Sequence, residues 1–130
     1  MMHAARPDRR VLVVEDELMI ALLFESILNA SSQCTVIGPF ARVKLALEAA
    51  RNEPLDAALL DIHLAGLPVF PVADVLAERG VPFAFITGYG KDVLPPVYRD
   101  RPLLQKPFRP EAVLASLAMM IVLPSTMFPK

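Results

Sequence analysis

The sequence predicts an α/β protein in which one parallel β-sheet is covered by helices on both faces. Strand-like and helix-like segments alternate along the chain, which is typical of successive βαβ units. The strand-like segments are short continuous apolar runs, as expected of parallel strands that are buried on both sides. Apolar residues make up 55% of the 130 residues, which is enough to cover both faces of a sheet.

Five strands are expected, and most of them end on a chemically reactive side chain. Their ranges are near 10–15, 34–38, 57–61, 82–87 and 102–105. The second strand is the exception, because it ends on Gly38-Pro39, which carry no reactive side chain. The carboxyl ends of parallel strands form the binding edge of an open α/β sheet. We therefore expect the polar groups at the other four strand ends to converge on one cleft.

Four regular helices are expected between and after these strands, near residues 17–30, 41–52, 69–79 and 110–122. Gly80 follows the third helix and suits the left-handed conformation that often ends a helix. Pro110 fits the first turn of the last helix, where its missing N–H costs nothing.

The fourth crossover departs from this regular alternation. Pro95 and Pro96 exclude a long helix between the fourth and fifth strands and leave room for a turn or two at most. We expect one domain over residues 10–123, with an N-terminal tail over 1–9 and a C-terminal tail over 124–130. Because this tail is short, we expect no DNA-binding or catalytic output domain after the last helix.

Composition excludes several classes of protein. The net charge is −1 and no basic stripe is present, which argues against a nucleic-acid partner. Cys34 is the only cysteine, so we expect a small core residue and neither a disulfide nor a cysteine metal cluster. The longest apolar run, 112–123, is too short to span a bilayer, and the first ten residues contain no apolar signal core. We expect a cytoplasmic protein with no membrane partner.

The polar residues at the strand ends have ordinary explanations when taken singly. Glu15 and Asp16 could cap a helix, and Asp61 could be a solvated loop acid. Thr87 could belong to a simple turn and Lys106 to the surface. Together they are more specific, because carboxylates packed within a few Å repel one another unless a cation intervenes. The cluster predicts a site for a metal ion and a phosphoryl group.

The segments VLVVEDE, LLDIHL, FITG and QKPF resemble the motifs of response regulator receiver domains, and the likeness extends over residues 10–123. The resemblance implies a flavodoxin-like sheet in the strand order 2-1-3-4-5. It also implies that Asp61 is phosphorylated by a sensor histidine kinase, directly or through a phosphotransfer protein. Thr87 would bond one phosphoryl oxygen and Lys106 would pair with another.

The same resemblance implies a bound Mg²⁺. Its ligands would be Asp16, Asp61, the backbone carbonyl of His63 and, partly through water, Glu15. Mg²⁺ prefers carboxylates, waters and phosphate oxygens, and this site would supply all three.

The sequence also departs from the usual receiver pattern. Leu103 stands three positions before the lysine, where the family commonly has an aromatic residue that moves inward on activation.

The FITGYG segment resembles a group of stand-alone receivers with a Phe-x-Thr-Gly signature. We expect Gly88-Tyr89-Gly90 to order on phosphorylation, since two glycines make ordering costly. His63 and Tyr89 either flank the hydrolytic water and set the dephosphorylation rate, or point to solvent.

The function predicted from the sequence is a single-domain response regulator that signals by protein contact. It would catalyse its own phosphorylation and slow dephosphorylation, and would not be an enzyme for external substrates. Three alternatives remain: a pseudo-receiver, a receiver fragment of a longer regulator, and a phosphatase with an aspartyl nucleophile. Such phosphatases carry a second acid two residues after the nucleophile, where this chain has His63.

The first helix offers a candidate surface for partners. It is apolar on more than one face, with one stripe at Ile20, Leu23 and Ile27 and another at Leu18 and Leu22. A helix buried on one side needs only one stripe. The second stripe is either a thick core contact, a docking surface for a kinase helix bundle, or the interface of a homodimer.

Overall fold

A computed structural model describes residues 8–30, 34–89 and 93–121 of the chain. Its centre is a five-stranded parallel sheet in the order β2-β1-β3-β6-β7. The strands are β1 (Arg9–Val14), β2 (Cys34–Phe40), β3 (Ala57–Asp61), β6 (Phe83–Thr87) and β7 (Leu103–Gln105). The order confirms the predicted flavodoxin-like topology, because these five strands follow the order 2-1-3-4-5 along the chain.

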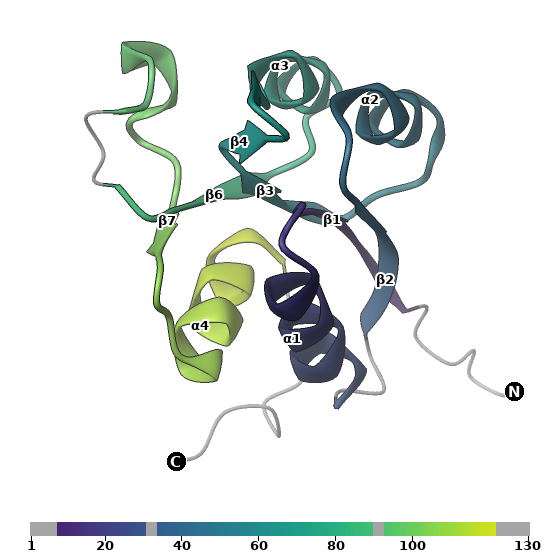
Figure 1. Cartoon of the computed structure of the whole chain (residues 1–130). Helices are drawn as coiled ribbons and strands as arrows, with labels where there is room; N and C mark the ends of the chain where they lie inside the picture. The colour runs from purple at the N-terminus through teal and green to yellow at the C-terminus, as the bar shows by residue number, and fades with distance from the viewer. Residues whose placement is uncertain (1–7, 31–33, 90–92, 122–130) are drawn as a thin grey trace, which may run out of the picture.

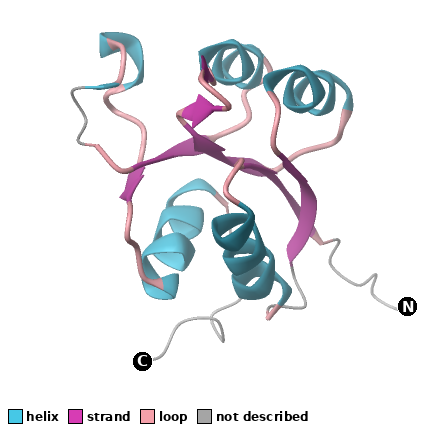
Figure 2. Ribbon diagram, in the orientation of Figure 1, coloured by secondary structure: helices cyan, strands magenta, loops and turns pink. Residues whose placement is uncertain are grey.

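Two helices cover each face of the sheet (Figure 1). On one face lie α1 (Leu18–Asn29) and α4 (Pro110–Met120), and on the other lie α2 (Val43–Asn52) and α3 (Phe70–Glu78). Each pair of helices packs against its own face through a separate cluster of buried apolar side chains. Figure 2 shows the sheet as the middle layer between them. No helix among the described residues is long and apolar enough to cross a membrane.

β2 is two residues longer than predicted. The strand continues past Gly38 to Phe40, and its pairing with β1 shifts register between Leu12 and Val14. Gly38 has a φ of +109°, a conformation open to glycine and costly for other residues. The irregularity brings the Phe40 carbonyl opposite Glu15, whose N–H donates to it at 2.9 Å.

A small hairpin after β3 was not predicted. β4 (His63–Leu64) pairs antiparallel with β5 (Leu67–Pro68), and the turn between them contains Ala65 and Gly66, both with positive φ. At the other end of the domain, Arg9 was assigned to the N-terminal tail but begins β1. The rest of the predicted tails, residues 1–7 and 124–130, lies outside the described residues.

The fourth crossover is short and irregular, as predicted. Its described part contains the three-residue 3₁₀ helix η2 (Pro96–Tyr98). Tyr98 is 5% exposed and packs against the rings of Phe70, Phe83 and Phe85. Its hydroxyl donates to Asp74 of α3. Tyr98, together with the buried Leu94, therefore holds the crossover against the sheet.

The buried face of α1 differs from the predicted stripe. Ala21, Phe24 and Leu28 are buried, while Ile20 and Ile27 pack at the margin and Leu23 is 36% exposed. The core contact is rotated because Phe24 stacks on Phe108, with ring centroids 5.0 Å apart. Leu18 and Leu22 of the second stripe are exposed, so that stripe is not a core contact.

Candidate functional site

The polar residues predicted at the strand ends all lie at the carboxyl edge of the sheet. Glu15 and Asp16 follow β1, Asp61 ends β3, Thr87 ends β6 and Lys106 follows β7. The strands are in register there, with Val14 beside Leu60 and Thr87 beside Gln105. A cavity of about 540 Å³ opens at this edge. Its lining residues are Asp16, Glu17, Asp61, His63, Gly66, Thr87, Gly88, Tyr89 and Lys106.

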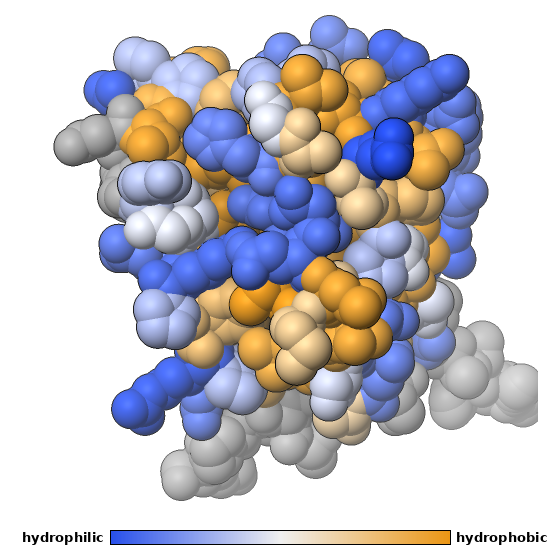
Figure 3. Space-filling view, in the orientation of Figure 1, coloured by the Kyte–Doolittle hydropathy of each residue, from blue (hydrophilic) through white to orange (hydrophobic). Residues whose placement is uncertain are grey.

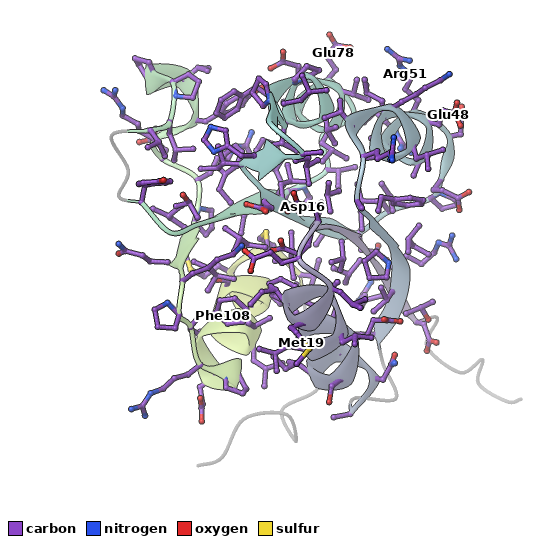
Figure 4. The ribbon with its side chains drawn as sticks, in the orientation of Figure 1. Asp16, Met19, Glu48, Arg51, Glu78 and Phe108 are labelled. Atoms are coloured by element: carbon purple, nitrogen blue, oxygen red, sulfur yellow. The ribbon has the colours of Figure 1, made fainter. Side chains whose placement is uncertain are left out.

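Three carboxylates form a compact cluster in this cleft. One oxygen from each of Glu15, Asp16 and Asp61 lies within 4.8 Å of the others. Glu15 and Asp61 are buried, and Asp16 is exposed. One oxygen of Asp16 accepts a hydrogen bond of 2.9 Å from the Ala65 N–H, which links the cluster to the β4–β5 hairpin. Figure 4 shows Asp16 above the start of α1.

The close packing of the carboxylates changes their ionisation. Burial raises the pKa of Asp61 to about 8, and the neighbouring Glu15 adds to the rise through a hydrogen bond and charge repulsion. The pKa of Asp16 moves the other way. Burial opposes this change, but hydrogen bonds from Ala65 and with Asp61 outweigh it and lower the pKa of Asp16. Asp61 therefore needs a nearby cation to stay ionised at neutral pH.

Lys106 supplies one such cation. Its Nζ lies 2.8 Å from Glu17 Oε1, 3.2 Å from Glu15 Oε1 and 3.6 Å from Asp61 Oδ2. Burial alone would lower the pKa of Lys106, but the contacts with Glu17, Glu15 and Asp61 outweigh burial and raise it. The Lys106 backbone N–H donates to the Thr87 carbonyl at 2.7 Å, which fixes the lysine beside β6.

Thr87, Gly88 and Tyr89 also line the cleft. Thr87 is 3% exposed, and its Oγ1 accepts a hydrogen bond of 3.0 Å from the Tyr89 N–H. Accepting this bond uses a lone pair of the oxygen and not the hydroxyl hydrogen. His63 and Tyr89 both line the cavity and both are exposed to solvent. The expected ordering of 88–90 stays a prediction, and Gly90 lies outside the described residues.

Leu103 does not line the cavity. It is half-buried and packs against the apolar cluster that contains Tyr98. The buried aromatic rings of this cluster include Tyr98 of the fourth crossover and Phe83 and Phe85 of β6, and none comes from β7. Leu103 therefore does not supply the aromatic switch that the family commonly has at this position, as predicted from the sequence.

Sequence reasoning missed two contributors to the site. Glu17 was grouped with Glu15 and Asp16 in the motif VLVVEDE but was given no role, although a third acid in the run was the available signal. Ala65 was not predicted either, because its contribution is a backbone N–H placed by the turn of the hairpin.

The donor set fits a small divalent cation. Three carboxylates of hard oxygen atoms converge, and oxygen is the ligand that Mg²⁺ prefers. Within the described residues Glu15 Oε1 is buried and has no hydrogen-bond donor, although Lys106 Nζ lies at 3.2 Å. Buried carboxylate oxygens usually have partners, so this atom is available as a ligand. The acidic cluster resembles the metal site of receiver domains.

Comparisons with known proteins agree with this geometry. No family model and no curated protein matches the sequence. The solution structure of SdrG from Sphingomonas melonis Fr1 is 39% identical with a TM-score of 0.79, and the alignment covers 91% of this chain and 100% of SdrG.

Two further solved structures extend the comparison. The receiver domain of the response regulator PhyR from Erythrobacter litoralis is 31% identical with a TM-score of 0.73, covering 88% of this chain and 90% of that one. A CheY-like receiver domain from Methanospirillum hungatei JF-1 shares the fold at 22% identity and a TM-score of 0.74, covering 86% of this chain and 92% of that one. The fold, the carboxylate cluster and these relatives together show that this chain belongs to the family of response regulator receiver domains.

Proposed function

We propose that the protein is a stand-alone response regulator that accepts a phosphoryl group on Asp61 from a sensor histidine kinase. The kinase would act directly or through a phosphotransfer protein. The observation that carries the proposal is the setting of Asp61, a buried carboxylate that faces Lys106 at 3.6 Å and lies beside two further carboxylates. The phosphorylated protein would act on its targets by protein contact and would turn over no external substrate in quantity.

Glu15, Asp16, Asp61 and the His63 backbone carbonyl would hold Mg²⁺. The convergence of the three carboxylates within 4.8 Å supports this set. When bound, the ion supplies positive charge that offsets the carboxylates and the incoming phosphoryl oxygens. The raised pKa of Asp61 supports the same assignment, since a neighbouring cation would keep this carboxylate in its nucleophilic, ionised form.

The proposed reaction makes one bond and breaks one. An oxygen of Asp61 attacks the phosphorus of a phosphohistidine, the P–N bond breaks, and its electron pair leaves with the imidazole nitrogen. The Thr87 hydroxyl donates to one phosphoryl oxygen and the Lys106 ammonium pairs with another. Hydrolysis resets the protein, as water attacks the phosphorus and releases inorganic phosphate. His63 and Tyr89 border the cavity through which that water would pass.

Phosphotransfer from a panel of histidine kinases tests this proposal. We expect the wild type to be labelled in Mg²⁺ and not in excess EDTA, and Asp61→Asn to stay unlabelled. Asp100→Asn is the matched control, because it makes the same change at an exposed site outside the cleft. Labelling of Asp61→Asn at the wild-type level would refute Asp61 as the phosphoacceptor.

The kinase would dock on an apolar patch of α1, which we define as Leu18, Met19 and Leu22. These side chains are 70%, 77% and 49% exposed. Figure 3 shows the patch directly below a hydrophilic band across the middle of the same face, and Figure 4 places Met19 on α1 below Asp16. Exposed apolar patches beside polar residues mark surfaces for protein partners. A helix bundle seated there would reach the rim of the phosphoacceptor cleft.

A charged substitution in the α1 patch tests whether the kinase docks there, independently of the phosphorylation reaction itself. We expect Leu22→Glu to slow phosphotransfer from the kinase at least tenfold while phosphorylation by acetyl phosphate is unchanged, since the small donor needs no docking surface. Leu45→Glu is the matched control, because Leu45 is also 49% exposed but lies on α2, on the other face of the sheet. Equal losses with both donors would contradict docking at α1.

A further inference from the structure

Glu17 makes the shortest contact to Lys106. Its Oε1 lies 2.8 Å from Lys106 Nζ, closer than Glu15 at 3.2 Å or Asp61 at 3.6 Å. Glu17 is the N-cap residue of α1, yet its side chain makes no capping hydrogen bond to the helix. A shorter acid, Asp, at this position ordinarily accepts a hydrogen bond from a backbone N–H group of the first turn. Here the carboxylate is turned to the lysine instead.

The acid that makes the shortest contact with the Lys106 ammonium lies outside the metal cluster. Glu15, Asp16 and Asp61 form the compact carboxylate set, and Glu17 is not part of it. Glu17 nevertheless lines the same cavity, with a side chain that is 62% exposed. A phosphoryl group on Asp61 would need Lys106 as a partner, so the two anions would compete for one ammonium.

We propose that Glu17 is a built-in competitor of the phosphoryl group, holding Lys106 in the unphosphorylated protein and yielding it when Asp61 is phosphorylated. The inference rests on the proposed function and deepens it. The exchange breaks no covalent bond: the ammonium leaves one oxygen anion for another and keeps its proton. The exposed Glu17 side chain can turn into water when it is released. The ion pair therefore favours the unphosphorylated state and shortens the life of the phosphorylated one.

The competition has an energetic limit. Partly exposed ion pairs contribute little, about 1 kcal/mol or less, which corresponds to roughly a fivefold change in an equilibrium constant. Glu17 would therefore adjust the phosphorylation equilibrium and would not abolish it. Glu17 is a positioning residue, since it acts on the phosphoryl group through Lys106.

Titration with beryllofluoride in saturating Mg²⁺ tests the inference without a kinase. We expect Glu17→Gln to bind this phosphoryl mimic about twofold to fivefold more tightly than the wild type, because Glu17 then no longer competes for Lys106. The affinity for Mg²⁺ alone should change by less than about twofold, since Glu17 is outside the cluster. Glu25→Gln, which removes the same charge from α1 outside the cavity, is the control and should match the wild type.

Glu17→Asp separates the ion pair from plain charge repulsion. The side chain is one methylene shorter, so the negative charge stays near the cleft while the 2.8 Å contact to Lys106 is lost. We expect this variant to bind beryllofluoride like Glu17→Gln. Wild-type affinity in Glu17→Asp would overturn the inference, and so would wild-type affinity in Glu17→Gln.

Phosphorylation by acetyl phosphate distinguishes a failure of the proposed function from a failure of the proposed role of Glu17. Glu17→Gln should be phosphorylated faster and lose the label more slowly than the wild type. A wild type that takes no label from acetyl phosphate and binds no beryllofluoride would refute the proposed function itself. A wild type that is labelled normally, with Glu17→Gln labelled identically, would overturn only the role of Glu17.

Discussion

The carboxyl group of Asp61 lies in surroundings that oppose its ionisation. Burial and the adjacent Glu15 raise its pKa to about 8, whereas in the unfolded chain it ionises near 3.8. The folded state therefore prefers the protonated form. The stability that follows from this preference is fully present below about pH 4 and is lost as pH rises toward 8.

Asp61→Asn should remove this pH-dependent loss. Because the amide carries no charge, we expect the variant to be more stable than the wild type by about 2 kcal/mol at pH 8 in EDTA, and by much less at pH 4. Urea unfolding at several pH values measures the difference. Asp100→Asn should show no such dependence, and a constant difference between Asp61→Asn and the wild type across this range would contradict the expectation.

The surroundings of Tyr98 allow a specific prediction of how its substitution changes the free energy of unfolding. Burial and the hydrogen bond to Asp74 raise its pKa to about 12, so it stays neutral in the ordinary pH range. We expect Tyr98→Ala to cost about 3 kcal/mol, because it empties the space between Phe70, Phe83 and Phe85. Tyr98→Phe should cost about 1 kcal/mol, since only the hydroxyl bond is lost.

Tyr89 gives the matched control for Tyr98. Its side chain is 64% exposed, so Tyr89→Ala should change the free energy of unfolding by about 0.5 kcal/mol or less. Urea unfolding of the three variants measures all of these differences. Equal effects of Tyr98→Ala and Tyr89→Ala would show that Tyr98 does not anchor the fourth crossover.

At the scale of single elements, the irregular end of β2 depends on one glycine. A Cβ at Gly38 would lie 2.8 Å from both Phe40 N and Val13 O, and the φ of +109° is unfavourable for alanine. We expect Gly38→Ala to cost about 2–3 kcal/mol, measured by urea unfolding. It should also weaken Mg²⁺ binding, because the backbone of Glu15 is held by the Phe40 carbonyl.

Gly88→Ala is the control for this substitution. A Cβ there would meet no atom within 4 Å, and the backbone is not in the left-handed region. The free energy of unfolding should therefore change by about 0.5 kcal/mol or less. If both glycine variants unfolded at the same urea concentration, the close contacts of a Cβ at position 38 would not lower the stability of the domain.

The sequence predicts well those elements whose formation depends on residues that are close together in the chain. Each buried strand is a short apolar run, and the residue that ends it is fixed by its place in that run, so Asp61 and Thr87 could be placed at one edge. Glu17 could not be assigned, because its contact with Lys106 joins residues 89 positions apart and depends on a side-chain orientation. The burial of Tyr98 in a proline-rich crossover likewise depends on rings contributed by α3 and β6.

At the scale of the whole molecule, the carboxylate cluster joins segments that are distant in the chain. Glu15 and Asp16 follow β1, while Asp61 ends β3, and only the paired strands hold the three together. An ion that binds this cluster binds the folded state and not the unfolded chain. Its binding free energy therefore adds to the stability of the entire domain.

Mg²⁺ should accordingly raise the thermal midpoint of unfolding. At a concentration of about one hundred times the dissociation constant we expect a gain of about 2.7 kcal/mol, or several degrees in a domain of this size. Asp16→Asn should lose most of the gain and Asp100→Asn should keep it, with sodium salt at equal ionic strength as the reference. The gain should be smaller at pH 5 than at pH 8, because protons compete with the ion at Asp61. An equal gain in Asp16→Asn would place the ion elsewhere on the molecule.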